Sequence, residues 1–561
     1  MSLDNTTSNE DSDLQYLVTF ERDYHGELVI DQLLSLESPT FNPIQNIHPL
    51  HKGYATLPHE LQLGIVSPLS LFRLFFTNEQ LQLMVENTNT YEQVKGREGG
   101  QVWNPLTLNE LKIWLGLIIY MGVHHINALD DLWNQDDKRT NHKIKRFISL
   151  YRFQQIKRFF HISALGQLHT QWYLKVEPFT SHIQSTVKKY YVPSSQVSID
   201  EMIVHFSGRS IHTVRVKNKP TPERYKIISL CDYSYTWAFV FTSRVKKNDL
   251  IESISGLNNI GCLIAHLANV LPNNKMYYIY MNNYFSSIPL FKYLREKGMG
   301  ACGTIRTNLF RFPKELKIGK KIALDWNTLL EKVINDILAI FWIDNGPVTM
   351  LTTIHEIVGE NWKVIRNRRQ PRKTSFNANT VCRVFGDRHR KELEILWIID
   401  DYNHYMGGVD IADQLREYYN CQLTVRRTWF PLFFWILDTV LVNCVIIYHK
   451  VTNSNISSKD FRINLVPQDL QTSSKGKRIV INKKYELPVT RLLGGDHFVE
   501  WREKRMACIY CCYLAQHGAK DINSDNPLQT QLWCTNCEVL LCCSKARPTC
   551  FRNFHLKDNK N

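Results

Sequence analysis

Apolar and polar positions follow two different periods along the middle of the chain. Between residues 108 and 121 apolar side chains recur at helical spacing, and a second helical stretch over 143–160 carries Lys and Arg on its polar face. From residue 196, short apolar runs bounded by Pro and Gly predict strands over 196–206, 212–217, 225–232 and 237–242. A helix over 250–269, a strand over 276–281, a helix over 287–297 and a strand over 301–306 follow. Strands first and helix–strand alternation afterwards predict a mixed α/β sheet.

The C-terminal half adds short strands and then becomes helical. Strands are predicted over 340–344 and 349–355, and a basic run follows over 366–373. The helical pattern after residue 400 includes an apolar stretch over 429–449 that contains Asp438 and Asn443. Polar side chains of that kind favour a buried helix over a membrane span.

The composition is that of a globular protein with a polyanionic partner. Of the 561 residues, 68 are Lys or Arg and 53 are Asp or Glu, so the formal net charge is +15. Residues 1–60 read as an acidic, weakly ordered tail, and no apolar secretory segment precedes the first basic residue, Arg22. A Lys/Arg cluster over 475–484 is a nuclear import signal, a phosphate-binding linker or a solvated linker. The basic face over 143–160 is likewise either solvated or in contact with phosphates.

Cysteines concentrate at the C-terminal end of the chain. Eight of the 14 lie in the last 54 residues, whereas the other six are scattered singly, as reduced buried thiols are. Two C-x-x-C pairs stand in front of four further candidate ligands; the set is Cys508, Cys511, Cys534, Cys537, Cys542, Cys543, Cys550 and His555. This pattern predicts two structural Zn²⁺ ions in a small cross-braced module over 506–558, with Cys512 and His517 as spare ligands and disulfides as the alternative.

Three aspartates occupy positions suited to metal-dependent chemistry. Asp200 lies in an apolar strand, and Asp410 and Asp413 follow Gly407 and Gly408. If a helix begins there, the i, i+3 spacing puts both carboxylates on one face. Carboxylates converging from a strand and a helix suit Mg²⁺, and a pair of such ions stabilises the attacking and leaving oxygens of phosphoryl transfer. On spacing alone, a helix cap and a solvated strand residue remain the favoured explanation.

Glycines 298, 300 and 303 match G-x-G-x-x-G but do not form a nucleotide site. A dinucleotide-binding motif follows a strand and opens a helix, whereas this one follows a predicted helix and precedes a predicted strand. We therefore expect a helix C-cap and a tight turn here, and we predict neither a small-molecule cofactor nor a small-molecule substrate.

Longer motifs resemble the piggyBac transposases, DDE/D recombinases with an RNase H-like core. The segment Asn109–Gly122 is similar to the family's N-terminal helix, and Phe147–Phe153 with Arg158–His161 resembles its S-x-x-R-F … R-F-x-H segment. Ser198-Ile-Asp-Glu201 resembles the first catalytic strand, and Tyr402–Gln414 resembles the block Y-N-x-x-M-G-G-V-D-x-x-D-Q.

The resemblance implies a catalytic site and reveals one departure from it. Asp200, Asp410 and Asp413 would be catalytic ligands of Mg²⁺ or Mn²⁺. The family's second catalytic Asp lies in D-N-x-F-[TS]-S, and here Asn282 holds that position. The closest acid in the following sequence is Glu296. An amide oxygen can ligate a cation but brings no charge, so we expect a large loss of rate.

The resemblance also implies a domain order. An RNase H-like core over 195–306 and 397–419 would be interrupted by an insertion domain over 307–396. A helical dimerisation and DNA-binding region over 61–194 and 420–500, the second part with the basic linker, would flank the core. The Cys-rich zinc module would bind transposon ends.

Three functions follow from these expectations. The favoured one is a nuclear, homodimeric, piggyBac-derived protein that binds double-stranded DNA but is catalytically impaired by Asn282. The second is a working cut-and-paste transposase that acts at TTAA sites and tolerates the amide. The third is a chromatin or protein-interaction module that uses the zinc domain. None of the three involves a membrane.

Overall fold

The computed structural model describes most of the chain in two compact units. The described residues are 41–44, 55–62, 66–95, 103–125, 128–134, 142–166, 172–215, 223–243, 251–273, 275–309, 311–318, 324–357, 362–374, 377–466, 497–516, 529–543 and 549–556. Unit 1 comprises Met1–Thr56 and Ile162–Asn443, and unit 2 comprises Leu57–His161 and Cys444–Asn561. Most of the predicted acidic tail and the whole cluster over 475–484 lie outside the described residues. The predicted domain boundaries stay predictions.

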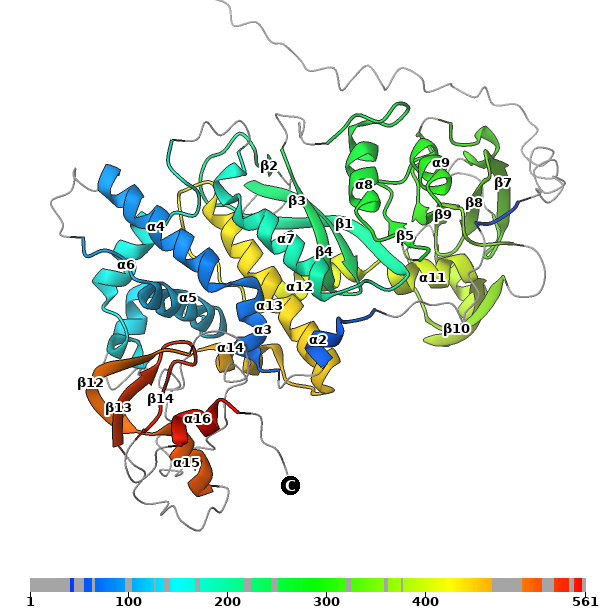
Figure 1. Cartoon of the computed structure of the whole chain (residues 1–561). Coiled ribbons are helices and arrows are strands. Elements are labelled where there is room, and N and C mark those ends of the chain that lie inside the picture. The colour runs from blue at the N-terminus through cyan, green and yellow to red at the C-terminus, as the bar shows by residue number, and fades with distance from the viewer. Residues whose placement is uncertain are drawn as a thin grey trace, which may run out of the picture. The chain divides into compact units, whose positions relative to one another are not determined.

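Unit 1 is built on one large sheet (Figure 1). Its strands are β1 (Gln196–His205), β2 (Val214–Arg215), β3 (Glu223–Asp232), β4 (Tyr235–Thr242), β5 (Tyr278–Met281), β6 (Gly300–Thr304), β7 (Leu329–Ile334), β8 (Ile337–Ile343) and β9 (Pro347–Thr352). The order is β2-β3-β1-β5-β6-β9-β8-β7, and β4 also pairs with β3. β1, β5 and β6 are parallel to one another, whereas β3 and β9 run antiparallel to their neighbours β1 and β6. The mixed α/β sheet is thus confirmed.

Helices and a hairpin complete unit 1. They are η6 (Leu174–Val176), α7 (Phe179–Tyr190), α8 (Asn259–Asn269), α9 (Ile288–Glu296), η7 (Lys314–Leu316), β10 (Lys363–Arg369), α10 (Ala378–Phe385), β11 (Arg390–Leu396), α11 (Trp397–Tyr405) and α12 (Gly408–Glu417). α12 packs on β1 and β3, and α11 packs on β6. α9 ends two residues before Gly298, whose φ of +73° allows the turn into β6. The expected C-cap and turn at these glycines are therefore confirmed.

The apolar stretch after residue 429 forms α13 (Phe430–Thr452). It is long and apolar enough to cross a membrane by length and composition, and 94% of its most apolar window is buried. Its Asn443 pairs with the backbone of Thr236, as donor to the carbonyl at 2.9 Å and as acceptor from the N–H at 3.0 Å. Asp438 accepts the Cys421 N–H at 3.0 Å. Both polar side chains are satisfied by protein backbone, as expected of a core helix.

Unit 2 combines helices with a small sheet. The helices are α2 (His59–Gln62), α3 (Pro68–Phe75), α4 (Asn78–Lys95), α5 (Leu108–Val123), η4 (Leu129–Trp133), η5 (Lys143–Arg146), α6 (Leu150–Phe159), α14 (Ser458–Leu465), α15 (Ile509–Gln516) and α16 (Cys550–Phe554). The strands β12 (Val499–Ala507), β13 (Gln529–Cys534) and β14 (Val539–Leu540) pair in that order.

Two predicted helices are shorter in the structure. The stretch over 143–160 divides into η5 and α6, because the Ser149 side chain accepts the Arg152 N–H and so caps a new helix. The helix expected from residue 250 begins as α8 at Asn259, where the Asn258 side chain accepts the Gly261 N–H. In both cases a polar cap set the helix start, which apolar spacing alone did not reveal.

Candidate functional site

The parallel pair β1 and β5 brings the first two candidate positions together. Ile199 and Met281 are direct partners in this pair. Asp200 and Asn282 each follow one of these partners, so they lie at neighbouring points of the same sheet edge. The Asn282 Nδ2 donates to the Asp200 Oδ1 at 2.8 Å.

A second contact fixes which end of the amide faces Asp200. The Asn282 Oδ1 accepts the Tyr284 N–H at 2.8 Å. A backbone N–H is only a donor, so the oxygen must face Tyr284 and the NH₂ group must face the carboxylate. The amide therefore gives Asp200 a proton donor at the position where the resemblance led us to expect a second carboxylate.

Asp200 is buried among negative charges. Burial raises the pKa of Asp200 to about 6; the charges of Glu201 and Asp410 raise it as well, and hydrogen bonds from the Glu201 N–H and the Asn282 amide lower it. The raised pKa indicates that burial disfavours the ionised form of this carboxyl group more than its two hydrogen bonds stabilise it.

Gly408 lets α12 approach this edge closely. A Cβ at this position would lie 2.3 Å from the Tyr233 carbonyl oxygen and 2.6 Å from the Ser198 Oγ. Helix α12 begins at Gly408, so the predicted helix start after the glycine pair is confirmed. Asp410 lies exposed in its first turn.

Asp413 is held by a buried arginine of its own helix. Arg416, whose side chain is 2% exposed, donates from Nη2 to the Asp413 Oδ1 at 2.8 Å and to the Ile203 carbonyl at 3.2 Å. Burial raises the pKa of Asp413, and the Arg416 charge opposes that shift. Arg416 also contacts Glu417, so it offsets only part of the charge that the Asp413 carboxylate would offer to a metal ion.

Glu201 is the acid nearest to Asp200 in the sequence, and it also has a cationic partner. Its Oε2 lies 3.0 Å from the Lys226 Nζ, which lies 3.8 Å from the centre of the Tyr284 ring. Glu201 therefore faces a lysine, and the amide of Asn282 holds the position next to Asp200. Neither Glu201, Lys226 nor Arg416 was singled out from the sequence, because their roles depend on cross-strand register and on a side chain folding back along its helix.

The acidic site thus fits a pair of divalent cations only in part. Asp200 and Asp410 influence each other electrostatically, but Asn282 presents a donor and Asp413 is paired with Arg416. Among the described residues, the sets of three or more potential ligands within 4.8 Å of one another are two Cys/His groups, and the three aspartates do not form another.

Those two groups lie in the C-terminal part of the chain, and the second extends to His497, which precedes the predicted module over 506–558. The first joins Cys508, Cys511, Cys542 and Cys550, and the second joins His497, Cys534, Cys537 and His555. They alternate along the chain, which is a cross-braced arrangement, and each offers the four ligands of a structural zinc site.

The spacing of the ligand atoms matches a tetrahedral ion. The Cys511 Sγ lies 3.5 Å from the Cys542 Sγ and 3.7 Å from the Cys550 Sγ. Sγ–N distances in the second group are 3.4–3.6 Å. With Zn–S of about 2.3 Å and Zn–N of about 2.0–2.1 Å, tetrahedral edges are roughly 3.8 Å and 3.6 Å. No disulfide joins the cysteines that the structure describes, so the disulfide alternative finds no support in this structure.

The ligand sets differ from the sequence prediction at one position. Cys543 is exposed and lies outside both groups, whereas His497, which precedes the first C-x-x-C pair, completes the second group. Cys512 is buried outside the groups, and His517 is not among the described residues. The His555 Nδ1 lies 2.7 Å from the Phe551 carbonyl oxygen, a contact that turns Nε2 toward the Cys534 and Cys537 sulfurs, where a metal ion would bind.

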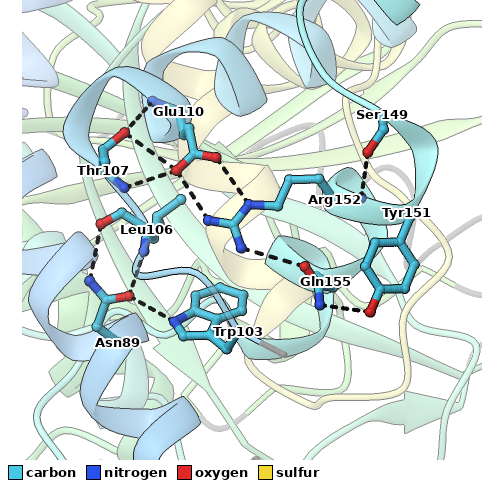
Figure 2. Close-up of polar contacts among 9 residues, drawn as sticks. All are labelled: Asn89, Trp103, Leu106, Thr107, Glu110, Ser149, Tyr151, Arg152 and Gln155. Atoms are coloured by element: carbon cyan, nitrogen blue, oxygen red, sulfur yellow. Dashed lines mark hydrogen bonds and ion pairs between the residues drawn. The ribbon is translucent and has the colours of Figure 1, made fainter. Parts of the chain in front are cut away.

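The basic side chains over 143–160, which η5 and α6 carry, are only partly available to a ligand. Figure 2 shows Arg152 of α6 in a two-point contact with Glu110 of α5, at 3.0 and 3.1 Å. The guanidinium also lies 4.5 Å from the Trp103 ring centre. Arg152 therefore ties α6 to α5, while Lys145, Arg146 and Arg158 are exposed.

Comparisons with known proteins agree with the fold. A family model described as "Transposase IS4" matches residues 67–445. A cryo-EM structure of a piggyBac transposase synaptic complex with hairpin DNA is similar with a TM-score of 0.61 and 21% identity, over 74% of this chain and 81% of that one. The fold is therefore that of a transposase.

Two similar human proteins indicate the family of transposases to which the chain belongs. PiggyBac transposable element-derived protein 3 is 22% identical over 83% of this chain and 75% of its own length. PiggyBac transposable element-derived protein 2 is 23% identical over 82% of this chain and 74% of its own length. The chain belongs to the piggyBac transposase family.

Proposed function

We propose that this chain is a nuclear DNA-binding protein derived from a piggyBac transposase, with strand-cutting chemistry impaired at Asn282. The observation that carries this proposal is the hydrogen bond from the Asn282 Nδ2 to the Asp200 Oδ1 at 2.8 Å. A carboxylate at position 282 would face Asp200 with a like charge, which a cation between them would relieve. The amide satisfies Asp200 without a cation.

The strands around the site support an RNase H-like core. The antiparallel series β4-β3-β1 continues into the parallel strands β5 and β6, and the two candidate acids of α12 are carried by a later helix that packs on β1. We assign residues 195–306 and 397–419 to this core and residues 307–396 to the insertion domain.

The acidic residues present would not hold a two-ion clamp in this arrangement. Asp200 and Asp410 are the side chains best suited to a single Mg²⁺ or Mn²⁺, since Asp413 is paired with Arg416, which also contacts Glu417, and Glu201 is paired with Lys226. A clamp on both reacting oxygens needs more negative charge than two carboxylates supply.

Double-stranded DNA is the proposed partner. The net charge of +15 suits a polyanion, and the similar solved structure is a complex with hairpin DNA. Transposon ends, TTAA targets, homodimerisation through the helical region and nuclear localisation belong to the same proposal. Two structural Zn²⁺ ions in the C-terminal module would support its fold, because a segment this short has little apolar core.

A strand-cleavage assay separates this function from that of an active transposase. We expect the unaltered protein to bind duplex DNA but to cut it orders of magnitude more slowly than an Asn282→Asp variant, in Mg²⁺ and in Mn²⁺. Equal cutting rates for the two proteins would overturn the impairment and favour the working transposase. If the unaltered protein fails to bind duplex DNA, the zinc module as a protein-binding domain becomes the better explanation.

A further inference from the structure

The hairpin of β10 and β11 carries basic side chains in two different situations. At its base, Trp362, Val364, Ile395 and Leu396 belong to an apolar cluster of unit 1. Two arginines further along β10 have carboxylate partners: Arg366 donates to Asp400 at 2.6 Å through Nε, and Arg368, which precedes the last residue of the strand, donates to Asp344 at 2.6 Å. These contacts anchor the hairpin to the body of unit 1.

The far end of the same hairpin concentrates uncompensated charge. Arg369 lies directly opposite Arg390 in the strand register, and Arg372, Lys373 and Arg388 follow in the adjoining segments. All five are exposed. Within the part of the chain that the structure describes, none of the five has a carboxylate oxygen within the 4.0 Å of an ion pair. We call these five residues the hairpin cluster.

Acidic neighbours do not balance this charge. Residues 369–373 and 386–392 contain six Lys or Arg and two acids, Asp387 and Glu392. The sixth basic residue, Lys391, donates to the Val384 carbonyl at 2.6 Å and so is already used. Like charges directly opposite each other destabilise an antiparallel pair, so the Arg369–Arg390 register is unfavourable until an anion lies between the two side chains.

We propose that the hairpin cluster binds the phosphate backbone of double-stranded DNA, a proposal that rests on the DNA-binding function above. Four of its five members are arginines, whose planar guanidinium matches phosphate oxygens in two-point contacts. Contacts of this kind add affinity without reading sequence.

Salt dependence of DNA binding tests the proposal in the whole 561-residue chain, loaded with zinc. The cluster variant carries Arg369→Gln, Arg372→Gln, Arg388→Gln and Arg390→Gln. A matched control carries Lys292→Gln, Lys332→Gln, Lys363→Gln and Arg383→Gln, which removes the same charge from exposed side chains that already have carboxylate partners in unit 1. Affinity for a random duplex is measured over 50–200 mM salt, a range in which phosphate contacts change affinity by orders of magnitude.

The slope of log K against log salt is negative, and removing one phosphate-binding side chain should reduce its magnitude by about 0.9. We expect the magnitude to decrease by roughly 2–4 in the cluster variant, because two to four of its arginines would bind phosphates. In the control it should decrease by less than about 1. Equal slopes for the unaltered protein and the cluster variant, or an equal fall in both variants, would overturn the hairpin site and leave DNA binding intact. A flat slope for the unaltered protein would overturn the proposed function itself.

Discussion

Asn282 and Asp200 form a hydrogen bond of 2.8 Å between neighbouring parallel strands, with the amide as donor. The Tyr284 N–H holds the amide oxygen, so the orientation of the pair is fixed by the backbone. An asparagine here changes more than the charge of the site, because it also puts an N–H donor where a carboxylate oxygen would bind a metal ion. At the same site, Asp413 forms an ion pair with Arg416, and Glu201 forms one with Lys226. Internal donors thus take over part of the charge compensation that metal ions supply in a carboxylate site.

The ionisation of Asp200 should make the protein less stable at neutral pH when no cation is bound at the acidic site. Its pKa of about 6 in the folded state lies above the usual value of 3.9 in an unfolded chain. The folded state therefore binds more protons between these values, so the free energy of unfolding falls as the pH rises from about 4 to 6, by roughly 2–3 kcal/mol for this group. Urea unfolding of the unaltered protein and of Asp200→Asn at pH 4.5 and 7 measures the effect.

The Asp200→Asn variant should gain stability relative to the unaltered protein as the pH rises, because it lacks the charge. If the difference in the free energy of unfolding between the two proteins is the same at both pH values, then burial does not raise the pKa of Asp200.

The two adjacent glycines before Asp410 should respond differently to substitution. Gly408→Ala places a methyl group 2.3 Å from the Tyr233 carbonyl oxygen, between β3 and β4, and 2.6 Å from the Ser198 Oγ of β1, so α12 must shift away from both, at a cost of about 1–3 kcal/mol. Gly407→Ala meets its nearest atom at 3.9 Å and should be tolerated. Unfolding midpoints of the two variants measured side by side test this packing. Equal midpoints would mean that α12 does not lie as close to β1 as described.

Zinc content distinguishes the two ligand sets for the C-terminal module. The sequence favoured Cys543, whereas the structure places His497 with Cys534, Cys537 and His555. His497→Ala should therefore reduce bound zinc from two ions to one per chain, and Cys543→Ser should leave two, as measured by elemental analysis of the purified proteins. The reverse result would restore Cys543 as the ligand.

Individual residues show which features of the structure could be predicted from the sequence and which could not. β1, β5 and the start of α12 followed from apolar runs and a glycine pair, because local patterning and turn chemistry determine such elements. His497 was missed because it stands alone, 11 residues before Cys508 and without the C-x-x-C spacing that marks a ligand pair. The adjacent Cys542 and Cys543 could not be ranked, since only the path of the chain after β14 turns one inward and the other outward.

In the acidic site, too, some features could be predicted from the sequence and others could not. The replacement of a carboxylate by Asn282 was visible in the motif, but the direction of its amide was not. Nor was the pairing of Asp413 with Arg416, because a side chain three residues along a helix can point either to its neighbour or to solvent. Contacts between distant segments decide such questions, and single-sequence patterns do not contain them.

Binding of Mn²⁺ to the zinc-loaded protein tests the central claim most directly, because it needs no DNA substrate. Titrations followed by electron paramagnetic resonance would compare the unaltered chain with Asn282→Asp and with Asn283→Asp, which adds the same charge one residue further on. We expect Asn282→Asp to bind Mn²⁺ at least about tenfold more tightly than the unaltered chain, equivalent to ~1.4 kcal/mol, and Asn283→Asp to change affinity by less than about threefold. Mn²⁺ binding by the unaltered chain as tight as by Asn282→Asp would contradict the account.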